Sequence, residues 1–199
     1  CEGRVLVDGK DVTLQSMQLP LRERIGVVPQ KATLFKGTIR ENLLWGRADA
    51  SEEELMSAAE IAQADEFICS KSYGYHTPVT EGGHSLSGGQ KQLLNLASVM
   101  VMQPEILILD EPANHLDLVY QKHIFSLIAQ WLKEPGRAVL SVVHDLSLAR
   151  RYGTHAVLMN RGKCAARGDI NDVLTPENLR SVYDMDVYGW MHEMLEQWK

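Results

Sequence analysis

The sequence of 199 residues predicts an α/β fold with a mainly parallel sheet. Two apolar runs, ILIL at 106–109 and AVLSVV at 138–143, have the length and continuity of strands buried inside such a sheet. The intervening residues 116–133 have a helical pattern, and alternation of strands with helices is typical of parallel pairing. We therefore expect a parallel sheet with both faces covered by helices.

Two shorter strand patterns precede this region. Residues 4–8 (RVLVD) and the following Gly9 predict a strand and a turn, and residues 24–30 (RIGVVPQ) predict a strand that stops at Pro29. Over residues 31–103 the strand signal fades and helical patterns replace it. We expect this stretch to form a largely helical part of the molecule.

Turn and capping signals divide the helical stretch. Ser51 and Glu54 have the spacing of a capping box, so a helix is expected to begin there. Residues 73–83 predict a turn-rich loop, and the helix that follows is expected to end near Pro104.

A hairpin and a helical tail are predicted beyond the last apolar strand. Residues 154–169 read as a β-hairpin that turns at 160–162 (NRG), and residues 175–199 are helical. Four apolar tail residues lie close to one helical stripe: Tyr188, Met191, Leu195 and Trp198. We expect this stripe to pack the tail or to contact a partner.

Composition excludes several classes of protein. The formal net charge of −6 argues against a nucleic-acid partner, which needs clustered Lys and Arg. The apolar runs are short (AVLSVV at 138–143 has six residues including Ser141), against the roughly 20 that cross a bilayer, so direct membrane insertion is not expected. The cysteines Cys1, Cys69 and Cys164 are odd in number and far apart, which favours a reducing compartment.

Polar side chains that suit phosphate chemistry follow the predicted strands. In an open parallel sheet, ligands bind at the carboxyl ends of the strands. Asp110 ends one strand and can orient Mg²⁺, while Glu111 can position and deprotonate an attacking water. His144 follows the next strand and can stabilise charge on a terminal phosphate, and Gln30 can reach both metal and water. By itself, the pair Asp110-Glu111 could be a solvated strand end, and His144 by itself could be a histidine of the core. The four residues together favour phosphoanhydride hydrolysis.

A glycine-rich segment, Ser87-Gly88-Gly89-Gln90, opens directly onto a helical run. Glycines leave backbone N–H groups accessible, and a helix N-terminus carries partial positive charge, so this segment suits phosphate oxygens. The plainer alternative is a helix N-cap formed by Ser87.

Taken together, these residues resemble the nucleotide-binding domain of ATP-binding-cassette (ABC) transporters. Five segments carry the resemblance in order: VVPQ (27–30, Q-loop), LSGGQ (86–90, signature), ILILDE (106–111, Walker B), NHLD (114–117, D-loop) and VVHD (142–145, switch histidine). The resemblance implies a RecA-like P-loop NTPase core formed by 1–30 and 104–172, an inserted helical subdomain at 31–103, and a tail at 173–199. It implies ATP and Mg²⁺ as cofactors, with Asp110 and Gln30 at the metal and Glu111, His144 and Gln30 catalytic.

The resemblance also implies two protein partners. A second nucleotide-binding domain would pair head to tail, so that the segment 87–90 closes over the partner's ATP, with Asp117 at the interface. A transmembrane subunit or domain would contact the Q-loop and the helical subdomain. The expected location is cytoplasmic, at the inner face of the cell membrane through that partner.

The sequence departs from the family pattern in two ways. No G-x-x-x-x-G-K-[ST] motif occurs, so we expect an N-terminally truncated cassette that hydrolyses ATP poorly by itself. Residues 21–46 and 80–92 resemble exporters, whereas the chain from Leu93 onward resembles importer subunits for iron chelates or cobalamin. A recombined or engineered chain (a chimera) would explain both resemblances, and so would an unusual natural lineage. Two alternatives stay open: a non-catalytic module that only completes a partner's ATP site, and a soluble ribosome-associated ABC protein.

Overall fold

The computed structural model describes residues 6–7, 10–11, 21–114 and 116–198. The chain divides into two compact units, Cys1–Val142 and Val143–Lys199, which are described separately below. Of the strand predicted at 4–8, only β1 (Leu6–Val7) is described, and it pairs antiparallel with β2 (Lys10–Asp11). The rest of that predicted strand and Gly9 lie outside the described residues.

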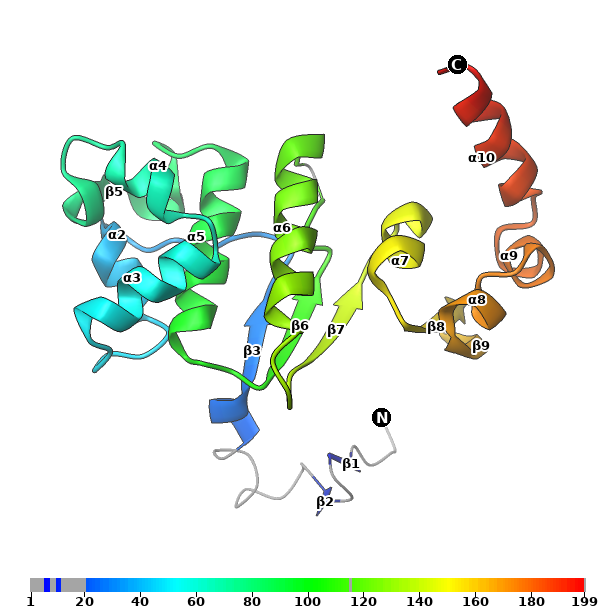
Figure 1. Cartoon of the computed structure of the whole chain (residues 1–199), viewed down its shortest axis with the longest axis horizontal. Coiled ribbons are helices and arrows are strands. Elements are labelled where there is room, and N and C mark those ends of the chain that lie inside the picture. The colour runs from blue at the N-terminus through cyan, green and yellow to red at the C-terminus, as the bar shows by residue number, and fades with distance from the viewer. Residues whose placement is uncertain (1–5, 8–9, 12–20, 115, 199) are drawn as a thin grey trace. The chain divides into compact units, whose positions relative to one another are not determined.

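A parallel sheet of three strands organises the first unit (Figure 1). Its order is β3 (Ile25–Val28), β6 (Ile106–Asp110) and β7 (Ala138–Val142), which confirms the predicted parallel strands. Val28 lies opposite Leu109, and Asp110 lies opposite Val142. The carboxyl ends of all three strands therefore meet at one edge of the sheet.

Two long helices cover one face of this sheet. They are α5 (Gly88–Val101) and α6 (Leu118–Trp131), the second confirming the helix predicted at 116–133. Both helices share one apolar core with Leu107 and Leu109, which are almost completely buried. Strand β3 packs closely on α5, because a Cβ atom added to Gly26 would lie only 2.3 Å from Val99 Cγ1.

The expectation of a sheet buried on both faces is wrong for the part of the chain that the structure describes. On the second face, Val27, Leu140 and Val142 are 53%, 62% and 50% exposed. The strand order explains this asymmetry. From β3 to β6 to β7 the chain always steps in the same direction, and right-handed crossovers then place both connecting helical layers on the same face.

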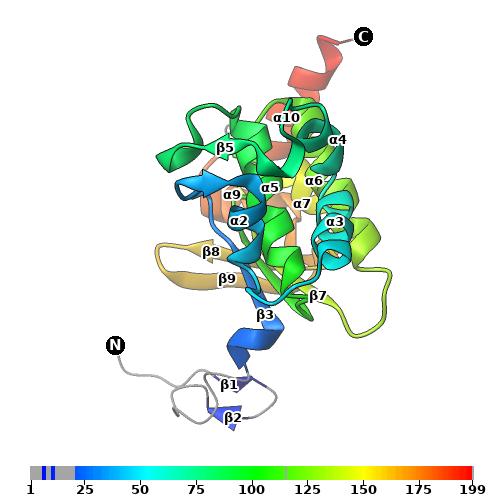
Figure 2. The same cartoon turned by 90° about the vertical axis from the view of Figure 1, so that its left-hand side faces the viewer.

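Short elements connect β3 to α5 (Figure 2). They comprise β4 (Gly37–Thr38), α2 (Ile39–Leu44), α3 (Glu52–Ile61), α4 (Asp65–Cys69), β5 (Pro78–Val79) and the 3₁₀ turns Gly74–His76 and Glu81–Gly83. Ser51 and Glu54 form the predicted capping box of α3. The pairing of β4 with β5 lies within a region where no strand was expected.

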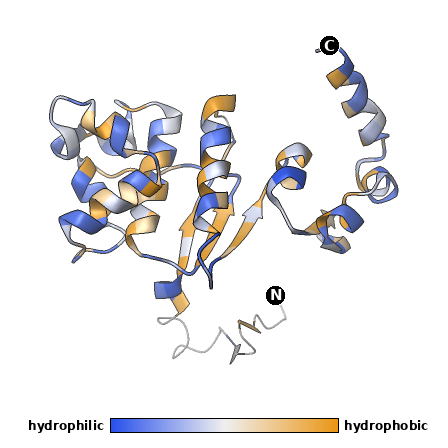
Figure 3. Ribbon diagram, in the orientation of Figure 1, coloured by the Kyte–Doolittle hydropathy of each residue, from blue (hydrophilic) through white to orange (hydrophobic). Residues whose placement is uncertain are grey.

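The second unit has a small core of its own. Its elements are α7 (Leu146–Tyr152), β8 (His155–Asn160), β9 (Lys163–Asp169), α8 (Ile170–Val173), α9 (Pro176–Tyr183) and α10 (Val187–Glu196). Strands β8 and β9 form the predicted hairpin. Leu158, Leu174 and Leu179 belong to the core, and Figure 3 shows polar and apolar residues alternating along the helices around it. Among the described helices, none combines the length and apolarity needed to cross a membrane.

Candidate functional site

The carboxyl edge of the parallel sheet brings Gln30 and Glu111 together. The Gln30 side-chain Nε2 donates a hydrogen bond of 2.8 Å to Glu111 Oε2. The same oxygen accepts a second bond of 2.7 Å from Asn114 Nδ2. Two side-chain donors therefore fix the orientation of the Glu111 carboxylate, and Asp110 immediately precedes it at the end of β6.

The backbone of Glu111 is in an uncommon conformation. Its φ is 46°, the left-handed region that costs a non-glycine residue about 1–3 kcal/mol. The Glu111 N–H donates to Val142 O at 3.0 Å, and the Asn114 N–H donates to Glu111 O at 3.0 Å. These bonds hold the chain as it leaves the sheet, and such strain is concentrated at functional sites.

The donor set at this edge fits Mg²⁺. Asp110 is exposed and offers a carboxylate, and Gln30 offers its amide oxygen, since its nitrogen donates to Glu111. Hard oxygen donors from one carboxylate, completed by phosphate and water oxygens, are the ligands that Mg²⁺ prefers.

The glycine-rich segment forms the start of α5. Ser87 caps this helix: its Oγ accepts from the Gln90 N–H at 3.2 Å, and Gln90 Oε1 accepts from the Ser87 N–H at 3.2 Å. The first-turn N–H groups of Gly88 and Gly89 have no intrahelical acceptor. Space beside Gly88 is open for 4 Å around a Cβ position. The N-cap alternative and the phosphate-binding interpretation are therefore compatible.

Tyr120 connects this segment to Asp117. A Cβ on Gly89 would lie 2.7–2.8 Å from the ring carbons of Tyr120, so the start of α5 packs directly on the first turn of α6. Asp117 caps α6 by accepting from the Val119 and Tyr120 N–H groups, each at 3.0 Å. The predicted segment 114–117 is described except for His115.

His144 belongs to the second unit. It is exposed and immediately precedes Asp145, whose carboxylate caps α7 through the Ser147 N–H at 2.8 Å and the Leu148 N–H at 3.1 Å. His144 therefore lies directly before the N-cap residue of α7.

Sequence reasoning missed the contacts of three supporting residues, of which Asn114 was named only as part of the segment 114–117. Asn114 holds Glu111, Tyr120 packs on Gly89, and the buried Gln92 of α5 donates to Pro29 O at 3.4 Å, next to Gln30. A signal existed for Asn114, which stands three residues beyond Glu111. Gln92 and Tyr120 contact residues that are distant in sequence, so no local pattern could identify them.

A second surface feature lies between the loop after β3 and α5. Phe35 and Trp45 stack with ring centroids 4.1 Å apart, and Trp45 is 66% exposed. Buried Asn42 holds this loop through the Phe35 N–H at 2.8 Å and carbonyl at 3.0 Å. A cavity of about 170 Å³ beside the stack is also lined by Asn95, whose buried Nδ2 has no partner among the described residues.

A model of the ABC transporter family matches residues 1–114. Among curated relatives, the ATP-dependent lipid A-core flippase of Legionella pneumophila is 33% identical over 193 residues, which cover 96% of this chain and 32% of the flippase. The cyclolysin secretion/processing ATP-binding protein of Bordetella pertussis is 38% identical over 177 residues, 89% of this chain and 24% of that protein.

A solved structure of a bacterial Atm1-family ABC exporter with ATP bound is also similar, with a TM-score of 0.80 and 32% identity. The similarity covers 97% of this chain and 32% of the exporter chain. This chain thus spans about a third or less of the proteins that it matches.

Proposed function

The chain belongs to the ABC transporter family, and we propose that it serves as an ATP-binding domain that couples ATP hydrolysis to solute transport. The observation that carries this proposal is the Gln30–Glu111–Asn114 hydrogen-bonded cluster at the carboxyl edge of the parallel sheet. Asp110 and Gln30 would hold Mg²⁺, which supplies charge neutralisation on the phosphates. Glu111, fixed by two donors, would orient and deprotonate the attacking water, and His144 would contact the terminal phosphate.

The segment 87–90 would act on a nucleotide held by a second, head-to-tail domain. The first-turn N–H groups of α5 and the open space beside Gly88 support this role, since a helix start is suited to anions. The contact between Gly89 and Tyr120 links this segment to Asp117, which would lie at the same interface. Adenosine triphosphate would therefore be enclosed between two domains.

A transmembrane partner would dock beside Phe35 and Trp45. Exposed stacked aromatic rings lie next to a small cavity lined by an amide nitrogen that has no partner in the described part of the chain. They are suited to a partner that adds both apolar contact and an acceptor. Gln92 of α5 donates to Pro29 O, which lies between the end of β3 and Gln30, so movement of α5 would reach the ATP site. The division into core (1–30, 104–172), subdomain (31–103) and tail (173–199), the importer-like character beyond Leu93 and the location at the inner face of the membrane remain predictions.

The second candidate is a non-catalytic module that completes a partner's ATP site. It is favoured by the start of α5, where the first-turn N–H groups and the open space beside Gly88 could meet a partner's nucleotide without any residue of the carboxyl edge of the sheet.

Titration calorimetry of the purified chain with Mg-ATP tests both candidates. Saturation at micromolar nucleotide would assign a complete ATP site to the chain itself. Failure to bind up to millimolar nucleotide, together with ATP-dependent association with an intact ABC nucleotide-binding domain, would assign the completing role. If the chain neither binds Mg-ATP nor associates with that domain, the proposal is contradicted.

A further inference from the structure

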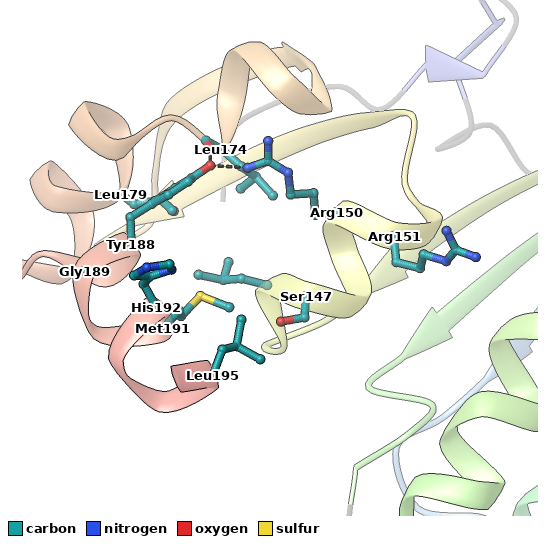
Figure 4. A pocket seen from close by; sticks show the side chains of 11 residues that line it. Ser147, Arg150, Arg151, Leu174, Leu179, Tyr188, Gly189, Met191, His192 and Leu195 are labelled. Carbon is teal, nitrogen blue, oxygen red and sulfur yellow. Dashed lines mark hydrogen bonds between the residues drawn. The ribbon is translucent and has the colours of Figure 1, made fainter. Parts of the chain in front are cut away.

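The second unit contains a pocket of about 800 Å³ for which the proposed function has no use (Figure 4). It lies between α7 and α10, and its floor includes Leu174 and Leu179, which are 5% and 2% exposed and belong to the core of this unit. The pocket therefore opens directly onto the core. Its volume is within the range of about 300–1,000 Å³ that is typical of small-molecule sites.

The long walls of the pocket are apolar. Tyr188, Met191 and Leu195 of α10, three members of the stripe predicted from the sequence, line one wall, and Leu146 of α7 lines the other. Leu195 is 64% exposed, so the stripe is incompletely covered by the described chain. A flexible alkyl chain laid along this wall would remove apolar surface from water, at about 25 cal/mol per Å².

One end of the pocket is cationic. Figure 4 shows the Arg150 guanidinium directed at the Tyr188 hydroxyl, to which it donates, while that hydroxyl donates to Leu174 O at 2.7 Å. A guanidinium has five N–H donors, and the acceptor here is a neutral phenol. Among the residues that the structure describes, no carboxylate forms an ion pair with Arg150. Its charge is therefore held in place without being compensated.

The other charged groups at the pocket favour the same sign of ligand. Arg151 contributes a second cation to the lining. His192 also lines the pocket, and its Nε2 lies 3.4 Å from Glu196 Oε1, one turn further along α10. The lining residues themselves include no Asp or Glu.

We propose that this pocket binds a free, single-chain anionic amphiphile such as a fatty-acid carboxylate. The carboxylate would take the open donors of Arg150, and the alkyl chain would lie against Leu146, Met191 and Leu195. This pocket shares no residue with the proposed ATP site, and the test of the pocket does not depend on the proposed function.

Calorimetric titration of the full 199-residue chain with monomeric decanoate tests the proposal. We expect saturable binding of decanoate, at least about tenfold weaker binding of decan-1-ol, and weaker binding still of decylammonium, because only the anion matches Arg150. Absence of decanoate binding, or equal affinity for the three compounds, would overturn the proposal.

Two variants test whether decanoate binds in this pocket, and a third variant serves as their control. Arg150→Gln keeps a donor for Tyr188 but removes the charge, so decanoate should bind about tenfold more weakly while decan-1-ol is unaffected. Ser147→Phe places a ring in the pocket from an exposed helix position and should abolish binding of both. Arg167→Gln, on β9 and outside the pocket, removes the same charge as a matched control and should change nothing. Retained binding in Ser147→Phe, with an unchanged circular dichroism spectrum, would contradict this site.

Vesicles of anionic phospholipid distinguish a free amphiphile from a membrane lipid. We expect decanoate to bind with the same affinity in the presence or absence of such vesicles. Binding to vesicles by a chain that ignores monomeric decanoate would overturn the proposal in favour of a lipid surface.

Discussion

At the scale of single residues, Glu111 combines backbone strain with firm side-chain restraint. Its left-handed φ of 46° is unfavourable, yet Gln30 and Asn114 both donate to the same carboxylate oxygen. Hydrogen bonds to a charged acceptor are stronger than neutral ones, so they offset part of the strain. A carboxylate fixed in this way is pre-organised for its proposed role before any nucleotide arrives.

Asn114→Ala is expected to lower the free energy of unfolding by about 1 kcal/mol, since a hydrogen bond to the Glu111 carboxylate is lost. Urea denaturation measures this change. The same substitution in a Glu111→Ala background should cost almost nothing, because the acceptor is already absent. Equal losses in both backgrounds would show that Asn114 acts through some other contact.

At the scale of elements, the two glycines that open α5 have opposite surroundings. Gly88 faces open space, whereas Gly89 is pressed against the Tyr120 ring of α6. The close approach of α5 to α6 therefore depends on one glycine only. The other is free for a phosphate, as the proposed role of the segment 87–90 requires.

Gly88→Ala should stabilise the protein by up to about 1 kcal/mol, because alanine is the better helix former and meets no neighbour. Gly89→Ala should destabilise it by about 1–3 kcal/mol through overpacking against Tyr120. Thermal and urea unfolding of both variants measure these opposite signs. Adding Tyr120→Ala to Gly89→Ala should remove the overpacking cost, and its persistence in the double variant would refute the contact.

The start of α3 predicts a dependence of stability on pH. The Arg47 guanidinium pairs with Glu54 and, together with the Ser51 N–H at 2.8 Å, holds the pKa of the Glu54 carboxyl below its ordinary value. A folded-state pKa below the unfolded value of about 4.3 gives stability that is present above that pH and lost as pH falls through the folded pKa.

Glu54→Gln should therefore lower the free energy of unfolding at neutral pH, and this loss should shrink as the pH falls below the unfolded pKa and through the lowered folded pKa of Glu54. Urea denaturation at several pH values measures the difference. Glu53→Gln is the matched control, since Glu53 forms no ion pair with any described residue of the chain. A loss for Glu54→Gln that stays constant with pH would exclude the Arg47–Glu54 pair as its cause.

The sequence predicted those elements whose signals are local. The strand ending at Pro29, the apolar strands before Asp110 and His144, and the helix capped by Ser51 all occur where expected. The pairing of β4 with β5 was missed because each strand has two residues and no alternating pattern. The exposure of Val27, Leu140 and Val142 among the described residues was missed for a different reason: apolar runs indicate strands, but strand order decides which face the crossovers cover.

At the scale of the whole molecule, the proposed residues fall into two groups that would serve different nucleotides under the proposed function. Gln30, Asp110 and Glu111 gather at the edge of the sheet, where they would act on ATP bound by their own domain. Ser87 and Gly88 lie at the start of α5, where they would act on ATP bound by a partner. Substitutions in the two groups should therefore be separable in a mixed assembly.

A complementation assay makes this separation measurable. An intact ABC nucleotide-binding domain whose own signature motif has been inactivated is mixed with this chain, and ATP hydrolysis is followed by phosphate release. We expect the chain to restore hydrolysis, because under the proposed function the start of α5 would contact the nucleotide held by the other domain. Ser87→Arg in the chain should abolish the restored rate, since a bulky side chain then replaces the phosphate contact. Glu111→Gln in the chain should leave the restored rate unchanged, because Glu111 would act on the other nucleotide position. Loss of the restored rate in Glu111→Gln would instead mean that this chain hydrolyses ATP in its own site.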